Sequence, residues 1–562
     1  MKLIKIMLIA SLLALGASCS NEQASRRKWV NDQLNSMTLR EQVAQLFVVA
    51  LHPRQGEAHI NKVLAELHDE QIGGIIWGQT TPTEYVHLLN KMQAQVRIPL
   101  LVTIDAEWGV AMRLDSVIRF PQQLTLGAIQ DNSLIYEFGL EVARQCHELG
   151  IHVNFAPVVD VNNNPNNPII NMRSFGENKF KVTEKAYAYM RGMQDGGIIT
   201  TLKHFPGHGD TDRDSHDELP VILHDKQRIN EIELYPFREL IKRGATGVMT
   251  AHLLIPALCQ ENIPSSQSKR IVTDLLQRDL GFRGLIVTDA LEMKGALYNR
   301  DQDRVALYSL IAGNHILEIP IDVRASIDVI VNAVENGEVS RKLIRKRAKK
   351  VLEAKYDLGL HKGFEPINPD GILGRLNTPQ AHDLRMRLAE ASLTLLANGD
   401  MLPLQNSQTI THVQIGQGDT FKKQLQERAN IELFTVDTDY TPENLDLITE
   451  NIRAGETIIV TYHNNPRRQT FANFDIDDSM IDFIENLAKN NNVILVFFGN
   501  PYALANFNNL DLFSGLIAAY DNSDEAQTSS ARAMFGERNF LGKLPITISP
   551  KFSEDFGLIT EF

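Results

Sequence analysis

Residues Lys203–His216 form the densest group of side chains in the chain that could carry out chemistry. The segment contains three histidines, three aspartates and two glycines within 14 residues, directly after an apolar run. The glycines and a proline allow a tight, irregular path for the backbone at this point. Three chemistries are available: metal binding, attack by a serine, and acid–base work by a histidine with an adjacent aspartate.

The residue pattern favours acid–base chemistry. A metal site could use His204, His208, His216 and Asp210, but the close helical histidine pair of many hydrolytic zinc enzymes is absent, so no metal is expected. A nucleophilic Ser215 lacks the G-x-S-x-G elbow. Asp214 could fix the tautomer of His216 and stabilise its protonated form. A polar surface loop without chemistry remains the alternative.

Asp289 is the second chemical feature of the sequence. It ends the apolar run Leu285–Thr288, and a carboxylate held on such a run suits a covalent nucleophile. A helix N-cap is the alternative reading of the same aspartate. A positioned carboxylate together with a separate acid–base group is the arrangement used for retaining glycoside hydrolysis.

Further polar residues could bind a sugar. Charge-assisted hydrogen bonds to hydroxyl groups are the strong kind, and five side chains could form them: Asp105, Arg113, Arg173, Lys203 and His204. For the two arginines a surface salt bridge is the alternative. Trp108 could stack on a sugar face or pack at the rim of the fold.

The elements that would position these residues alternate between apolar runs and amphipathic helices. Such runs indicate buried parallel strands in βα units. The expected strands are 47–51, 74–77, 100–105, 152–157, 200–204, 247–252, 285–289 and 316–319, and the helices between them include 57–70, 82–95, 133–149, 179–192, 225–242 and 272–280. Eight units predict a (β/α)₈ TIM-type barrel, with an open doubly wound sheet as the alternative. Asp105, Lys203, His204, His252 and Asp289 would then converge at its carboxyl face.

A second α/β series begins at residue 391. Its expected strands are 393–397, 412–415, 433–436, 457–462, 493–498 and 516–519, which predicts a three-layer α/β sandwich. Gly and Pro residues punctuate the stretch before it. We therefore expect a catalytic barrel at 27–360, a linker at 361–390 and a C-terminal sandwich domain at 391–562.

The amino end reads as a targeting segment. Residues 1–19 have two lysines, an apolar stretch and small residues before Cys19, which is typical of a secretory signal. The end of this segment resembles a bacterial lipobox, which implies lipidation of Cys19, a tether at 20–26, and an exported protein anchored by lipid to a bacterial membrane, facing the periplasm or the exterior. Cys146 and Cys259 are expected to be two buried thiols rather than a disulfide.

Composition limits the classes of partner. The 562 residues carry a formal net charge of −13 and are 43% hydrophobic, an ordinary globular balance that gives no reason to expect disorder. An acidic chain argues against nucleic acid as a partner. The expected partner is a small carbohydrate, and the oligomeric state stays open.

Ordered motifs across residues 30–360 resemble glycoside hydrolase family 3, in its β-N-acetylglucosaminidase (NagZ-type) branch and two-domain lipoprotein form. They are Asp105–Gly109 with Arg113, Asn154–Val161, Arg173–Gly176, Lys203–His216, and Gly281–Gly284 leading to Asp289. Two departures stand out: Trp108 replaces a usual glycine, and Asn314-His315 stands where an acidic residue is usual. Near the carboxyl end, 536–538 and 542–545 resemble the second domain of the family.

The resemblance implies roles for these residues. Asp289 would be the nucleophile, His216 the acid–base and Asp214 its partner, while Asp105, Arg113, Arg173, Lys203 and His204 would hold the terminal sugar. The implied activity is a retaining exo-β-N-acetylglucosaminidase acting on muropeptides without a cofactor. The alternatives are a β-glucosidase or β-xylosidase of the same family, a GlcNAc phosphorylase, and a non-catalytic sugar-binding lipoprotein.

Overall fold

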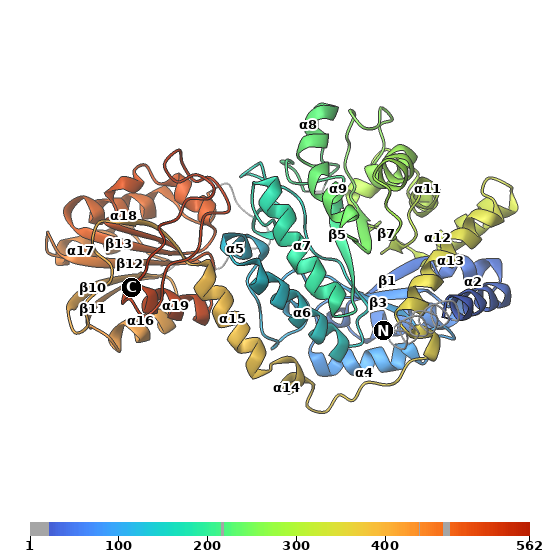
Figure 1. Ribbon diagram of the computed structural model, residues 1–562, viewed down its shortest axis with the longest axis horizontal. Helices are drawn as coiled ribbons and strands as arrows, with labels where there is room; N and C mark the ends of the chain where they lie inside the picture. The colour runs from blue at the N-terminus through green and yellow to red at the C-terminus, as the bar shows by residue number, and fades with distance from the viewer. Residues whose placement is uncertain (1–21, 215–217, 438, 465–472) are drawn as a thin grey trace, which may run out of the picture.

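The computed structural model describes residues 22–214, 218–437, 439–464 and 473–562. The chain folds into an eight-stranded barrel followed by a smaller α/β domain, and helices α14 (Ile372–Leu376) and α15 (Pro379–Ser392) connect the two (Figure 1). Ser215, His216 and Cys19 lie outside the described residues.

The barrel sheet is closed and parallel. Its strand order is β7-β6-β5-β4-β3-β2-β1-β8, and a parallel bridge between Val287 and Ile316 joins β7 to β8. The strands are β1 (Phe47–Leu51), β2 (Gly74–Trp77), β3 (Leu101–Ile104), β4 (Val153–Asn154), β5 (Ile199–Phe205), β6 (Gly247–Thr250), β7 (Leu285–Thr288) and β8 (Leu317–Glu318). The predicted barrel is therefore confirmed, and the open-sheet alternative is wrong.

Helices follow the strands around the outside. They are α2 (Leu39–Ala44), α3 (Glu57–Glu70), α4 (Pro82–Gln93), α5 (Gln123–Ala128), α6 (Asn132–Glu148), α7 (Lys179–Asp195), α8 (Lys226–Glu231), α9 (Leu234–Lys242), α10 (Lys294–Leu297), α11 (Val305–Ala312), α12 (Val323–Glu335) and α13 (Arg341–Asp357). The helix predicted at 225–242 is divided in two, because Pro236 cannot donate a backbone N–H inside a continuous helix. The helix predicted at 272–280 is a π-helix, Arg270–Asp279.

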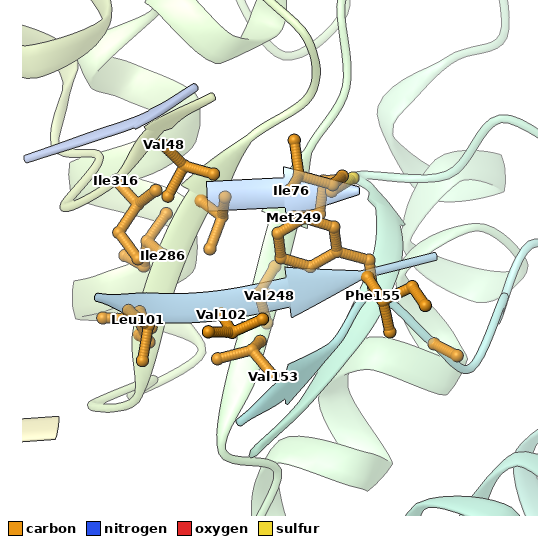
Figure 2. Packing of buried hydrophobic residues seen from close by; sticks show 14 of the residues in the cluster. Val48, Ile76, Leu101, Val102, Val153, Phe155, Val248, Met249, Ile286 and Ile316 are labelled. Carbon is orange, nitrogen blue, oxygen red and sulfur yellow. The ribbon is translucent and has the colours of Figure 1, made fainter. Parts of the chain in front are cut away.

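The interior of the barrel is packed with apolar side chains. Figure 2 shows Val48, Ile76, Val102, Val153 and Val248 from different strands packed together, and all of them are buried. A TIM-type barrel is thus a filled core and not a pore. Polar chemistry is confined to the carboxyl rim of the strands.

The chain before the barrel is helical over residues 22–36. Arg26, the last residue of the expected tether, forms ion pairs with Asp357 (2.6 Å) and Glu353 (3.3 Å) of α13. Within the described ranges, no helix combines the length and the apolarity needed to span a membrane.

The C-terminal domain has a six-stranded sheet in the order β11-β10-β12-β13-β14-β9, with β9 antiparallel to its neighbour. Its elements are β9 (Thr394–Asn398), β10 (Thr409–Ile415), α16 (Asp419–Gln426), β11 (Asn430–Val436), α17 (Pro442–Asn451), β12 (Thr457–His463), α18 (Asp478–Asn490), β13 (Asn492–Phe498), β14 (Gly515–Ala518) and α19 (Asp524–Met534).

Successive side chains of a β-strand point to opposite faces of the sheet, so alternate residues of each strand pack into two separate apolar cores. Val493 and Leu495 of β13 pack on the side of α17 and α18, whereas Ile494 and Val496 pack on the side of α16 and α19. Helices therefore cover both faces, which confirms the predicted three-layer sandwich. Leu124 and Met172 of the barrel extend the first of these cores across the domain boundary.

Both cysteines of the described chain, Cys146 and Cys259, are buried free thiols, as expected. Burial in apolar surroundings raises the pKa of the Cys146 thiol to about 12. It therefore stays protonated and unreactive at neutral pH.

Candidate active site

A cavity of about 560 Å³ opens at the carboxyl face of the barrel. It is lined by side chains from the ends of most of its strands, among them Asp105, Glu107, Arg113, Arg173, Lys203, His204, His208, Asp289 and Glu318. All five residues predicted to hold a sugar, together with the predicted nucleophile, line this one cavity.

Asp105 follows β3 and lies between two cations. Its carboxylate accepts hydrogen bonds from Arg113 (2.5 Å) and from the Nζ of Lys203 (2.8 Å). Although burial alone would raise the pKa of Asp105, these two cations hold it well below its usual range. The carboxylate therefore stays ionised and is suited to accept hydrogen bonds from sugar hydroxyls.

Lys203 and Arg173 also share a second carboxylate. Glu107 is fully buried and lies 2.8 Å from the Nζ of Lys203, and Arg173 binds it through two nitrogens at 2.9 and 2.7 Å. Burial opposes its charge, but Arg173 and Lys203 nevertheless hold the pKa of Glu107 below the ordinary value. This two-pronged contact fixes the plane of the guanidinium, which leaves little freedom for the donors that face the cavity.

His204 is oriented from behind by a buried carboxylate. Its Nδ1 lies 2.7 Å from Asp160, and its Nε2 lies 3.2 Å from Arg173. The backbone N–H groups of His204 and His208 also donate to Asp160. Asp160 thus clamps both ends of the turn between the two histidines. Burial lowers the pKa of His208 to about 4, so its imidazole is neutral at physiological pH.

Asp289 directly follows β7 and is partly exposed to the cavity. Its backbone N–H donates to Thr250 of the neighbouring strand (2.9 Å), and its own side chain accepts from the Ala290 N–H (2.9 Å). This backbone anchoring fixes one carboxylate oxygen. His252 is buried behind the rim, where Nδ1 lies 2.7 Å from Ser266.

The acid–base prediction falls at the edge of the described chain. Asp214 is partly exposed, and its carbonyl accepts from the N–H of Glu218. His216 lies outside the described residues, so its role stays a prediction. The segment leading to Asp214 is held at Gly209, where an added Cβ would lie 1.9 Å from the carbonyl oxygen of Val161.

The sequence alone does not assign a role in this site to three of its buried residues: Glu107, Asp160 and Glu318. Glu107 and Asp160 stand inside the motifs Asp105–Gly109 and Asn154–Val161, where a carboxylate among apolar residues is the signal that could identify them. His208, considered above only as a metal ligand, also lines the cavity. Glu318 sits on the last strand, 3% exposed, and its Oε2 has no hydrogen-bond partner in the described part of the chain. Burial and the charges of Asp105 and Asp289 raise its pKa well above the usual value, which favours the protonated form.

Two residues noted as unusual in the sequence have structural roles. Trp108 is 7% exposed and packs behind the rim, with the Arg119 guanidinium 5.4 Å from its ring centroid. His315 is buried and accepts a hydrogen bond from the N–H of Ile286. Burial holds the pKa of His315 well below its ordinary value, so it is a neutral core residue.

The chemistry of the site fits a neutral polyhydroxylated ligand. Fixed donors and acceptors alternate around one wall, and a carboxylate stands at the end of β7. Among the described residues, no group of three or more His, Cys, Asp or Glu side chains is arranged to hold a metal ion.

Comparisons with known proteins agree with this architecture. Residues 38–354 match the model of the glycosyl hydrolase family 3 N-terminal domain, and 393–557 match that of its C-terminal domain. β-Hexosaminidase A of Pseudoalteromonas piscicida is 28% identical over 514 residues, covering 81% of this chain and 84% of that protein. β-Hexosaminidase LpqI of Mycobacterium tuberculosis is 32% identical over 312 residues, covering 53% and 78%.

A solved structure extends the likeness to both domains. A family 3 β-N-acetylglucosaminidase from Paenibacillus sp. str. FPU-7 superposes with a TM-score of 0.77 at 29% identity, covering 92% of this chain and 99% of that one. A β-glucoside phosphorylase, BglX, shares the fold at 21% identity with a TM-score of 0.78, covering 93% of this chain and 95% of that one. With both domain models matched in order over most of its length, the chain belongs to glycosyl hydrolase family 3.

Proposed function

We propose that the protein is a retaining exo-β-N-acetylglucosaminidase that removes terminal non-reducing GlcNAc from peptidoglycan fragments. It is a glycoside hydrolase of the N-acetylhexosaminidase type, which agrees with the β-hexosaminidase names of its relatives. The observation that carries the proposal is that Asp289 shares one cavity with the Asp105, Lys203 and Arg173 network.

The proposed reaction has two steps. Asp289 attacks the anomeric carbon, a glycosyl–aspartate ester forms, and the bond to the leaving oxygen breaks as His216 gives that oxygen a proton. His216 then takes a proton from water, which attacks the same carbon and releases the sugar and the free carboxylate. Asp214 would orient the imidazole and stabilise its cationic form.

The charged wall of the cavity supports binding of a terminal sugar. Asp105 would accept from hydroxyl groups, while Arg113, Arg173, Lys203 and His204 would donate to them. Because carboxylates hold these groups in place, little side-chain entropy is lost on binding.

A labelling experiment tests the nucleophile. A mechanism-based fluorosugar of GlcNAc configuration should inactivate the enzyme and leave its mass on the peptide containing Asp289. Asp289→Asn should abolish both labelling and turnover of nitrophenyl-GlcNAc, whereas Asp274→Asn, on the outer π-helix, should change neither. Label on another residue, or full turnover by Asp289→Asn, would contradict the assignment.

A comparison of substrates tests which terminal sugar the enzyme prefers and whether water or phosphate accepts the released sugar. Nitrophenyl-GlcNAc should be cleaved in preference to nitrophenyl-glucoside, and muropeptides should release free GlcNAc, identified by mass spectrometry. Preference for the glucoside would favour a β-glucosidase. Phosphate-dependent formation of a sugar phosphate would favour a phosphorylase.

The acid–base role proposed for His216 can be tested by substitution. His216→Ala should slow hydrolysis by roughly 10²–10⁴, as expected for lost acid–base assistance, with a smaller effect on activated leaving groups. The measurement is kcat on aryl glycosides of increasing leaving-group pKa. A His216→Ala enzyme with unchanged rates on all of them would refute the role.

We also propose that the protein is exported and anchored by lipid at Cys19. The signal-like residues 1–19 support this. Expressed in a bacterium, the protein should partition into detergent, and Cys19→Ala should move it to the aqueous phase.

A further inference from the structure

An asparagine-rich stretch, residues 162–171, lies between the rim of the cavity and the C-terminal domain, and the proposed mechanism uses none of its side chains. Asn162, Asn167 and Asn171 are 1%, 0% and 2% exposed. Buried carboxamides are retained in proteins when their hydrogen bonds are satisfied, so the partners of these three residues indicate what they do.

On its inner side, this stretch holds the segment that leads to Asp214. The Nδ2 of Asn167 donates to the carbonyl of His208 (2.9 Å) and to the hydroxyl of Thr211 (3.3 Å). The Nδ2 of Asn164 donates to the carbonyl of Thr211 (3.2 Å). The path of the chain over 208–211 therefore depends on where the asparagine stretch sits.

The same stretch also sets Arg173. The Oδ1 of Asn167 accepts from the N–H groups of Ile169 (3.0 Å) and Ile170 (2.9 Å), and the carbonyl of Ile169 accepts from Arg173 (3.3 Å). Asn171, two residues before Arg173, has a φ of 31°, a conformation that asparagine tolerates better than most residues. The segment that leads to Asp214 and the sugar-binding Arg173 are thus both hydrogen-bonded to one short loop, residues 162–171.

On its outer side, the stretch is bound by two buried residues of the C-terminal domain. Asn500, 6% exposed, donates from Nδ2 to the Oδ1 of Asn171 (2.8 Å). Tyr502, 1% exposed, accepts from the Nδ2 of Asn162 (2.9 Å). A further bond between Asn171 and Asn162 (3.1 Å) closes the network. Asn500 and Tyr502 belong to the turn after β13 and its short helix, Pro501–Asn506.

We propose that Asn500 and Tyr502 are positioning residues through which the C-terminal domain holds the 162–171 loop, and with it the 208–214 segment, in the geometry needed for acid–base catalysis. The inference rests on the proposed function, because it assigns the acid–base role to the segment that ends at His216. Small displacements of a catalytic group are costly, so a remote hydrogen bond can control the rate.

Paired substitutions in the full-length protein test the proposal. Asn500→Asp keeps the Oδ1 that accepts from the Tyr502 N–H but removes the donor to Asn171, and Tyr502→Phe removes only the hydroxyl. Asn506→Ala is the control, since it lies in the same short helix and its side chain donates to Asn473 instead of the barrel. Thermal unfolding checks that each variant is folded.

The readout is the ratio of rates on two aryl GlcNAc glycosides, one with an activated nitrophenol and one with an unactivated phenol. Only the second needs full protonation of its leaving oxygen. We expect Asn500→Asp and Tyr502→Phe to lose about ten-fold in kcat on the unactivated glycoside and no more than about two-fold on the activated one. Asn506→Ala should match the wild type on both.

Equal losses on the two glycosides, or none on either, would overturn the positioning role. A merely structural effect lowers the fraction of active enzyme, which fluorosugar titration measures, and leaves the ratio unchanged. Failure of the proposed function is distinguishable, because the wild-type protein would then release phenol from neither glycoside.

Discussion

Glu318 is the side chain whose environment is least expected from the sequence. It is a carboxylic acid on a barrel strand, next to a cavity that already contains Asp105 and Asp289, with Lys203 and Arg113 as the nearby cations. Since its pKa in the folded protein is raised, it holds a proton that the unfolded chain releases above its ordinary pKa. Folding stability should therefore fall with rising pH on account of this group.

Glu318→Gln should remove this pH dependence. Gln presents the same shape without an ionisable proton, so the stability gap should widen in favour of the variant by about 1.4 kcal/mol for each pH unit between the ordinary glutamate pKa and the raised pKa of Glu318. Unfolding by denaturant at a series of pH values measures the gap. A gap that does not widen with pH would show that Glu318 is ionised in the folded protein.

At the scale of single residues, sequence reasoning predicted which side chains share the cavity better than it predicted what holds them. Asp105 and Lys203 stand at strand ends and were identifiable from that position. Glu107 and Asp160 accept from groups on distant segments of the chain, and these pairings depend on the closed barrel. Glu318 is a carboxylate in a short apolar run, but only the closed barrel brings it close to Asp105 and Asp289.

Among the elements, the β5 strand and the turn after it depend on one glycine. Gly209 approaches the backbone of Val161 so closely that a methyl group would overlap its carbonyl. We expect Gly209→Ala to cost about 1–3 kcal/mol through overpacking and to reduce kcat by displacing the segment toward Asp214. Denaturant unfolding and steady-state kinetics measure the two effects.

The matched control is Gly374→Ala in α14, where an added methyl group meets no atom within 4 Å. This change should be neutral or slightly stabilising, because alanine has the higher helix propensity. If both variants behaved alike, close packing at Gly209 would not be the cause.

Strand positions were the most predictable elements, because buried parallel strands are continuous apolar runs. Phe47–Leu51 and Gly74–Trp77 were predicted with their observed bounds. Helix interruptions were less predictable, because Pro236 lies within the amphipathic pattern of 225–242. A π-helix at Arg270–Asp279 also resembles an α-helix in its apolar periodicity over so short a length. The short β4 strand was predicted too long, because an apolar run continues past its last ladder residue.

Across the whole molecule, buried imidazoles predict sensitivity to acid. Burial lowers the pKa of His152 and His412 to about 3, and of His208 and His463 to about 4. Unfolded histidine titrates near pH 6.5, so between pH 6.5 and 4 the unfolded chain binds protons that the folded chain does not. Stability should therefore decline as pH falls through this window.

The thermal midpoint should drop steadily from pH 7 to pH 4, well before the carboxylates Asp105 and Glu107 can be protonated. Replacing His412, which is far from the active site and bonded to Thr461, by Asn should reduce the slope without changing activity at pH 7. A midpoint that stays constant down to pH 4 would contradict the depressed imidazole pKa values.

The order of two α/β units could be predicted from the sequence, but the way they join could not. The contacts from Asn500 and Tyr502 to the barrel connect residues more than 300 positions apart. No local sequence pattern predicts these contacts, because Asn500, Tyr502 and their asparagine partners each have the sequence context of an ordinary turn residue.

The packed interior of the barrel has a kinetic consequence, since it makes the cavity a dead end. In the proposed reaction, the terminal sugar enters by its non-reducing end and can leave only through the same entrance. The shortened glycan still occupies that entrance after cleavage. The remainder of the chain must depart before the freed monosaccharide does. We therefore expect one cut per encounter instead of a continuous run along a strand, with accumulating monosaccharide competing directly against fresh substrate.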